Sequence, residues 1–215
     1  MTQRPVRPHP PGHRKLWPVR IVAGRLGGRT LVAPPKGTRP TSDRVREAIF
    51  SRLDHLDVLD GTRVLDLYSG SGALGLEAAS RGARHVTLVD SARAAVAAAR
   101  RNVATLGLAA HVQIVTGPVE RYTAALAAAP PVSGAALDLV FLDPPYDLSD
   151  DGLAGVLRDL AAPGVLASGA VIVVERSARS PEPSWPEGLA AFGRKSYGET
   201  MVHYAEPAAP DRAIS

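Results

Sequence analysis

The sequence predicts an α/β fold built on a mostly parallel sheet, and three observations support that prediction. The stretch from Val64 to Gly82 consists of a short apolar run, a glycine-rich turn and an apolar segment with helical periodicity. Apolar runs of strand length alternate with helix-length segments as far as residue 175. Their links are short, which favours parallel strands joined by right-handed crossovers. Ligands of such sheets bind beyond the carboxyl ends of the strands, so the residues there are the first candidates for chemistry.

The elements are predicted in chain order from apolar spacing and turn residues. Residues 19–33 are expected to form two short strands joined near Gly24 to Gly28, a basic β-hairpin. Thr41, Ser42 or Asp43 can cap the helix that follows. The other predicted strands begin at Val64 and span 85–89, 111–115, 137–142 and 169–175, and the other predicted helices begin at Ala73 and span 91–106, 119–129 and 147–162. Residues 189–195 and 199–206 are predicted to be antiparallel edge strands.

Composition excludes several kinds of site. The chain of 215 residues is 45% hydrophobic, enough for one α/β domain with an appendage. It has no cysteine, which rules out disulfides, a thiolate nucleophile and cysteine-ligated metals. The six histidines are scattered without a helical pair, so no metal site is expected. The N-terminus lacks the apolar core of a secretory signal, so a cytoplasmic protein is expected.

Positive charge is concentrated at the N-terminal end. Residues 1–46 carry a net charge of +10, whereas residues 47–215 carry −6. This segregation favours contact between the N-terminal part and a polyanion, although a solvated basic tail would also fit residues 1–16. Candidate nucleic-acid contacts are Arg20, Arg25, Arg29, Lys36, Arg39 and Arg44. Arg39, Arg44 and Arg46 cluster at the start of a predicted helix, where a phosphate or carboxylate could be held.

The glycine-rich turn predicts a nucleotide-type cofactor site. Gly70, Gly72 and Gly75 match G-x-G-x-x-G, and Asp90 follows 20 residues after the first glycine, where an acid that binds a ribose is expected. A dinucleotide and S-adenosylmethionine both need such a bare backbone. This pattern alone leaves both cofactors open.

The segment Asp143-Pro144-Pro145-Tyr146 follows the predicted strand 137–142 and is the second strong signal. Each proline stiffens the chain and removes a backbone N–H, so the segment offers hydrogen-bond acceptors only. Asp143 and the Pro144 carbonyl can accept the two hydrogens of an exocyclic amine, and Tyr146 offers a ring on which a base can stack. This pattern predicts methyl transfer to an amino group, with Asp143, Pro144 and Tyr146 as the catalytic candidates.

With these motifs, the chain resembles the RsmD-like family of ribosomal RNA methyltransferases, which modify N2 of guanine 966 in 16S RNA. The likeness runs from about Val19 to Tyr204. It depends on residues 20–24 and 28–31, on the block Arg39 to Phe50, on Val64 to Glu77, and on Asp143 to Tyr146. The R-P-T-x-D-R-V-R-E block is the most specific of these.

The resemblance implies a class I S-adenosylmethionine-dependent methyltransferase fold, which is Rossmann-like, with a seven-stranded sheet whose last strand is antiparallel and an N-terminal β-hairpin extension. Composition predicts a disordered tail at 1–18 and a flexible tail at 207–215, and the resemblance implies an RNA-facing extension at 19–60 and a methyltransferase domain at 61–206. The partner would be 16S ribosomal RNA or the small ribosomal subunit, and a monomer is expected.

Site residues follow from the same resemblance. Asp66 and the loop Tyr68, Ser69, Gly70 and Gly72 would contact the methionine part of the cofactor, Asp90 its ribose, and Pro118 and Val119 its adenine. A proline at 118 departs from relatives with a polar residue there, because it cannot bond the adenine amine through its side chain. Thr41 and Arg44 would hold the cofactor carboxylate or line the RNA entrance.

Three other functions fit part of the sequence pattern. A nicotinamide-dependent oxidoreductase fits the glycine pattern but finds no hydride-accepting site at 143–146. A DNA adenine-N6 or cytosine-N4 methyltransferase shares both motifs but usually carries a target-recognition insertion. A non-catalytic RNA-binding module would leave the acceptor segment unexplained. A cysteine-dependent C5 methyltransferase is excluded, because the covalent adduct needs a cysteine.

Overall fold

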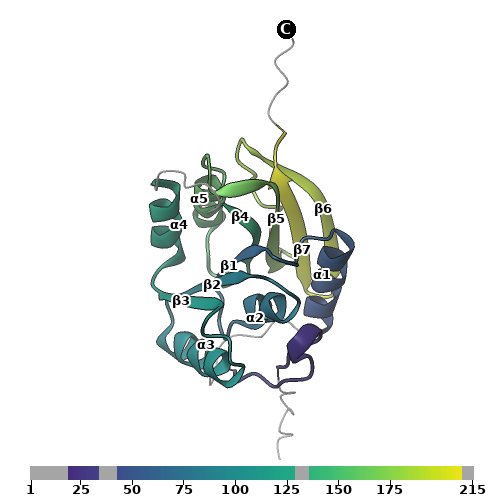
Figure 1. Ribbon diagram of the computed structural model, residues 1–215. Coiled ribbons are helices and arrows are strands. Elements are labelled where there is room, and N and C mark those ends of the chain that lie inside the picture. Colours follow the sequence, from purple (N-terminus) through teal and green to yellow (C-terminus); the bar gives the residue numbers. More distant parts are fainter. Residues whose placement is uncertain (1–18, 34–42, 129–135, 210–215) are drawn as a thin grey trace, which may run out of the picture.

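A computed structural model describes residues 19–33, 43–128 and 136–209 of the chain (Figure 1). The predicted disordered tail at 1–18 and the candidates Lys36, Arg39 and Thr41 lie outside the described residues. Residues 210–215 of the predicted C-terminal tail also lie outside them, and Pro207, the first residue of that tail, is the last residue of a strand.

One mixed seven-stranded sheet organises the protein, in the order β3-β2-β1-β4-β5-β7-β6. Strands β1 to β5 are parallel, and β7 is antiparallel to both β5 and β6. The strands are β1 (Arg63–Leu67), β2 (His85–Asp90), β3 (Val112–Thr116), β4 (Leu137–Leu142), β5 (Leu166–Ser177), β6 (Leu189–Tyr197) and β7 (Thr200–Pro207). The sheet confirms the class I methyltransferase type of fold, including the antiparallel last strand.

Helices cover both faces of the sheet, and each face has its own core. The helices are α1 (Asp43–His55), α2 (Ala73–Ser80), α3 (Arg93–Thr105), α4 (Val119–Ala128) and α5 (Asp150–Leu160). Helices α1, α2 and α3 pack with Val64, Val86 and Phe141 of the sheet, whereas α4 and α5 pack with the alternate strand residues such as Leu65 and Val140 (Figure 1). Strands buried on both faces explain the continuous apolar runs of the sequence.

Three predictions about these elements need correction. Helix α5 begins at Asp150 rather than residue 147, because Ser149 caps it by accepting a hydrogen bond from Gly152 N at 3.1 Å. Strand β5 extends to both sides of the predicted 169–175. The last two strands are not both at the edge, because β7 lies between β5 and β6. Within the described residues, no helix is long and apolar enough to cross a membrane.

The N-terminal segment, residues 19–33, pairs with itself less than predicted. Its antiparallel contact is a single bridge between Arg20 and Thr30, closed by the short 3-10 helix η1 (Gly24–Leu26), so it contains no strands of its own. Instead it packs on the body of the protein, where Ile21 and Leu31 are buried in the same core as α1 and α2. Even a complete two-stranded hairpin is only marginally stable in water, so a segment with a single bridge depends on this packing.

Gly75 allows α2 to lie against the sheet. A Cβ atom on Gly75 would lie 2.5 Å from Leu88 Cδ2 and 2.9 Å from Val86 Cγ1, both fully buried. We expect Gly75→Ala to lower the free energy of unfolding by about 1–3 kcal/mol, as overpacked cores do. Gly155→Ala, in α5 with no atom within 4 Å of the new Cβ, should leave stability unchanged or raise it slightly. Urea unfolding of both variants tests this, and equal stabilities would contradict it.

Candidate active site

The glycine-rich loop joins β1 to α2 and keeps its surface open. Gly70 and Gly72 have φ values of 55° and 81°, which disfavour any residue with a side chain. Gly72 donates from its N–H to the Ser69 carbonyl at 2.7 Å and is the first residue before α2. No atom lies within 4 Å of the position where a Cβ of Gly70 would stand. A ligand can therefore approach the backbone closely at Gly70.

Asp66 lies in β1 beneath this loop and is buried. Its Oδ2 accepts a hydrogen bond from Gly75 N at 2.8 Å, whereas its Oδ1 is buried without a hydrogen-bond partner among the described residues. The pKa of Asp66 is raised to about 8, mainly by burial and also by the charges of Asp143 and Asp90, although the hydrogen bond from Gly75 acts to lower it. The unpartnered Oδ1 is an acceptor that a bound ligand can satisfy.

Asp90 ends β2 and ties the loop to the neighbouring elements. Its Oδ2 accepts from Gly70 N and its Oδ1 from Ala92 N, each at 2.8 Å. Its backbone carbonyl accepts from Gly117 N at 3.1 Å, which brings the residue before Pro118 to the same edge. Pro118 itself is exposed, but the side chain of Val119 is only 2% exposed and packs in the core beneath α4.

Tyr68 takes an unusual backbone conformation at the start of the loop. Its φ of 58° is rare for a residue with a side chain, and such strain often marks functional positions. Its hydroxyl donates to Glu120 Oε1 at 2.8 Å, and burial together with this contact raises the pKa of Tyr68. The sequence patterns did not single out Glu120, which is the acidic residue in the first turn of α4.

The acceptor segment 143–146 lies directly beside the glycine-rich loop. Strand β4 pairs with β1 in parallel, and Asp143 N approaches the Leu67 carbonyl at 3.5 Å. The carboxyl ends of β1 and β4 therefore place Asp143 next to Tyr68. Asp143 is half-buried and Pro144 is buried, whereas Tyr146 is 78% exposed and has room for a stacking partner.

Arg176 of β5 holds the chain just after Tyr146. Its Nη2 lies 2.7 Å from Asp150 Oδ1, and its Nη1 donates to the Leu148 carbonyl at 3.4 Å. Leu148 N in turn donates to the Pro145 carbonyl at 3.0 Å. This contact could not be predicted from sequence patterns, because 26 residues separate Arg176 from Asp150.

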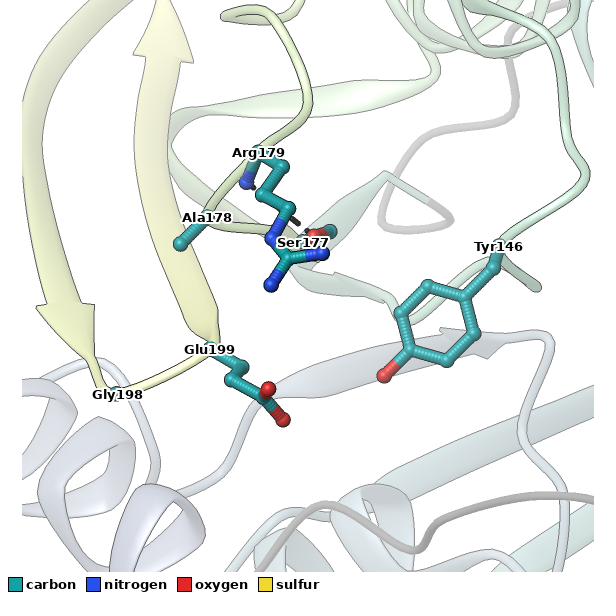
Figure 2. Close-up of a pocket in the computed structure, with 6 residues that line it drawn as sticks. All are labelled: Tyr146, Ser177, Ala178, Arg179, Gly198 and Glu199. Atoms are coloured by element: carbon teal, nitrogen blue, oxygen red, sulfur yellow. Dashed lines mark hydrogen bonds between the residues drawn. The ribbon is translucent and has the colours of Figure 1, made fainter.

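A hollow of about 400 Å³ adjoins Tyr146. Figure 2 shows the tyrosine ring on one side, with the side chains of Arg179 and Glu199 on the other. Arg179 follows β5, and Glu199 lies in the turn between β6 and β7. Neither residue was a candidate from sequence, since each becomes significant only through its place beside Tyr146.

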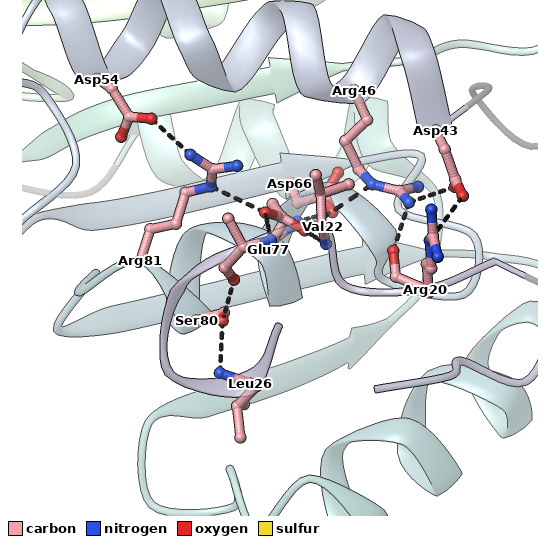
Figure 3. Close-up of polar contacts among 12 residues, drawn as sticks. Arg20, Val22, Leu26, Asp43, Arg46, Asp54, Asp66, Glu77, Ser80 and Arg81 are labelled. Atoms are coloured by element: carbon pink, nitrogen blue, oxygen red, sulfur yellow. Dashed lines mark hydrogen bonds and ion pairs between the residues drawn. The ribbon is translucent and has the colours of Figure 1, made fainter. Parts of the chain in front are cut away.

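The basic residues of the N-terminal part have two different roles. Arg20, Arg25, Arg29 and Arg44 are exposed, as a nucleic-acid contact requires. The prediction that Arg46 clusters with Arg39 and Arg44 to hold a phosphate or carboxylate is wrong, because the Arg46 side chain is fully buried. Figure 3 shows it paired with Asp43 instead. Its Nη2 donates to the Arg20 carbonyl at 2.5 Å and to Asp43 Oδ1 at 2.6 Å, and its Nε lies 4.0 Å from Glu77 Oε2.

Glu77 of α2 holds the N-terminal segment onto the body. Its carboxylate accepts from Val22 N at 2.6 Å, from Ala23 N at 2.9 Å and from Arg81 Nε at 2.8 Å (Figure 3). The Glu77 side chain is fully buried. An acid in the otherwise apolar helix ALGLEAAS was the available signal for a buried ion pair.

These residues fit the donor groups of S-adenosylmethionine. The unpartnered Asp66 Oδ1 suits an N–H group or a positive charge, and the open backbone at Gly70 suits close approach of a ligand chain. Asp90 stands at the tip of the neighbouring strand. Among residues 19–33, 43–128 and 136–209, no group of three or more histidines and acids is arranged to hold a metal ion.

The raised pKa of Asp66 predicts a pH-dependent stability. Because the pKa of Asp66 is about 8 in the folded state and 3.8 in its ordinary, exposed state, the folded protein holds a proton on Asp66 that the unfolded chain has lost between about pH 4 and pH 8, and the free energy of unfolding falls as pH rises through this range. We expect the stability of the unliganded wild type to fall relative to Asp66→Asn over this range, by at most about 1.4 kcal/mol per pH unit. Urea unfolding at pH 5, 6.5 and 8 measures the difference. A difference that stays constant with pH would contradict the assignment.

Comparison with known proteins places the chain among methyltransferases. Residues 19–206 match the family described as conserved hypothetical protein 95. The chain is 36% identical to YlbH of Bacillus subtilis over 185 residues, covering 86% of this chain and 96% of that protein. It is 34% identical to ribosomal RNA small subunit methyltransferase D of Escherichia coli K12 over 194 residues, covering 88% and 90%. The solved structure of yhhF from Escherichia coli has a TM-score of 0.76 at 31% identity and covers 90% of this chain and 100% of that one.

Proposed function

The chain belongs to the conserved hypothetical protein 95 family, the RsmD family, and from that membership we propose that it is an S-adenosylmethionine-dependent ribosomal RNA methyltransferase. Its Escherichia coli relative is a small subunit rRNA methyltransferase by name. The finer proposal is methylation of the exocyclic N2 of a guanine in 16S RNA, either free or within the small ribosomal subunit. We propose that it acts on this substrate as a monomer in the cytoplasm.

The observation that supports this proposal is the adjacency of the acceptor segment and the glycine-rich loop. Asp143 and the Pro144 carbonyl lie at the tip of β4, and the Asp143 backbone approaches the end of β1 at 3.5 Å. Acceptors at this point hold both hydrogens of an amine and leave its nitrogen lone pair directed away from them. Tyr146, exposed beside them, stacks on the base that carries the amine.

The cofactor would be held by residues at or just after the carboxyl ends of strands β1, β2 and β3. Asp66, Tyr68, Ser69, Gly70 and Gly72 would hold its methionine part, Asp90 its ribose, and Pro118 and Val119 would border its adenine. When bound, S-adenosylmethionine supplies a methyl group on a positively charged sulfur. Asp143 would align the acceptor nitrogen and stabilise the positive charge that develops on it, and alignment alone is worth effective molarities of about 10⁵–10⁸ M in small-molecule reactions.

The second candidate, a DNA adenine-N6 or other nucleic-acid amino-methyltransferase, is favoured by the same acceptor segment. The methylated product distinguishes an RNA guanine-N2 methyltransferase from this second candidate. We expect tritium from labelled cofactor to enter 16S RNA and not DNA. Mass mapping of 16S RNA from a strain lacking this protein, with and without added enzyme, should locate one N2-methylguanine that appears only after addition. A methylated adenine, or label in DNA alone, would reject the proposal.

The exposed arginines of the N-terminal segment are proposed to dock RNA phosphates. We expect the double variant Arg25→Gln, Arg29→Gln to bind RNA more weakly and to lower the slope of log affinity against log salt by about one per arginine. Arg121→Gln with Arg158→Gln, exposed on the α4 and α5 side, is the matched control and should leave the slope unchanged. An equal effect of both pairs would reject a specific docking role.

Charge substitution is a better test here than truncation. A deletion of residues 1–46 would also remove Ile21, Leu31 and the first turn of α1, which belong to the core. The shortened chain would lose activity through unfolding alone.

A further inference from the structure

The hollow beside Tyr146 presents opposite charges that the proposed methyl transfer does not use. Tyr146 follows β4, Ser177 ends β5 and is followed by Ala178 and Arg179, and Gly198 and Glu199 form the turn between β6 and β7. The volume of about 400 Å³ lies within the range of about 300–1,000 Å³ found for small-ligand sites. In Figure 2 the guanidinium of Arg179 and the carboxylate of Glu199 both extend toward the space that the ring of Tyr146 borders.

Backbone hydrogen bonds join the parts of the chain that line this hollow. Ala178 N donates to the Glu199 carbonyl at 2.8 Å, which ties the end of β5 to the β6–β7 turn. Arg179 N donates to Ser177 Oγ at 3.2 Å. On the opposite side, Arg176 binds Leu148 and Asp150 and so connects β5 to the segment after Tyr146. Hydrogen bonds therefore connect the segments of the chain that carry Arg179, Glu199 and Tyr146.

Opposite charges in one hollow match the edges of guanine. Guanine carries the N1–H donor next to its N2 amine, and the acceptors O6 and N7 follow around the ring. A carboxylate accepts from N1–H, and an arginine donates to O6 and N7, which is the commonest specific contact to guanine. Adenine reverses both features, since its N1 accepts and its exocyclic amine replaces O6. Residues that read N1–H and O6 must be neighbours, as Glu199 and Arg179 are.

We propose that Glu199 and Arg179 select guanine as the base presented to Asp143, with Glu199 accepting from N1–H and Arg179 donating to O6 and N7. This inference rests on the proposed RNA methyltransferase function and adds its base specificity. A phosphate of a flanking nucleotide is the other ligand that Arg179 could take. Glu199 in the same hollow disfavours it, because the carboxylate repels a phosphate.

The test uses 2-aminopurine, which keeps the N2 amine but lacks O6 and has an acceptor at N1. Small subunits are reconstituted with 16S RNA that carries guanine or 2-aminopurine at the position methylated by the wild type. We expect wild type to prefer guanine in kcat/KM by about 100-fold or more, and Glu199→Gln and Arg179→Ala each to reduce that preference by about 10-fold. The ratio of the two substrates within one variant does not depend on how much of that variant is folded.

Matched controls are Glu187→Gln and Arg121→Ala, exposed residues that do not line the hollow, whose guanine preference should equal that of the wild type. If Glu199→Gln and Arg179→Ala lower kcat/KM equally for both bases, the residues do not read the base and the inference is wrong. That result leaves the methyltransferase assignment standing. If the wild type forms no N2-methylguanine at all, the proposed function fails and the specificity proposal fails with it.

Discussion

Replacing Asp143 by alanine is expected to reduce kcat by about 10²- to 10⁴-fold, the range usual for a positioned group that holds or moves a proton. The carboxylate stands at the tip of β4 beside the start of the glycine-rich loop, where it accepts an N–H of the target amine in the proposed reaction. Without it the amine loses both its alignment and its nearby negative charge. Single-turnover methylation of the small subunit with saturating cofactor measures this step directly.

Cofactor affinity separates this role from a structural one. Removal of Asp143 takes one negative charge away from a cationic cofactor, but it also makes Asp66 easier to ionise, because the charge of Asp143 raises the pKa of Asp66, so the two effects on cofactor binding oppose each other. Calorimetric titration with S-adenosylmethionine is therefore expected to give a dissociation constant within a few-fold of the wild type. Asp143→Asn, which keeps one acceptor oxygen, should retain more activity than Asp143→Ala. Full turnover in Asp143→Ala would show that the amine is held elsewhere.

Replacing Glu77 by alanine is expected to lower the free energy of unfolding by about 3–5 kcal/mol, the usual result of breaking a buried ion pair. The substitution removes the acceptor for two backbone N–H groups of the N-terminal segment and for Arg81 Nε. It also removes one of the two carboxylates that lie beside the fully buried guanidinium of Arg46, and leaves Asp43 as the other. The N-terminal segment should therefore detach before the sheet unfolds.

Urea unfolding and hydrogen exchange test this expectation together. Glu182→Ala is the matched control, since Glu182 pairs with Arg194 at 2.8 Å but the two side chains are 48% and 62% exposed. An exposed pair is worth about 0–1 kcal/mol, so this variant should unfold nearly as the wild type does. Faster exchange confined to residues 19–33 in Glu77→Ala would support the anchoring role. Equal stability of the two variants would contradict it.

Local sequence determined the parts of the protein that repeat a simple pattern. The glycine-rich turn, the strand before it and the helix after it lie where the apolar spacing put them, because period and turn chemistry act over a few residues. Strand 137–142 was predicted to the residue, and Asp143 and the glycine-rich loop meet because neighbouring parallel strands end at one edge of the sheet. The roles assigned to these residues stay predictions.

Tertiary structure alone decided which charges are inside and which strands are neighbours. Arg44 and Arg46 look alike in the sequence, yet one is exposed and the other is fully buried between α1, α2 and the N-terminal segment. The insertion of β7 between β5 and β6, and the meeting of Arg179 with Glu199 beside Tyr146, join residues that are far apart in the chain. Periodicity records only the face that a residue takes on its own element. Its burial and its partners depend on what the rest of the chain packs against that face.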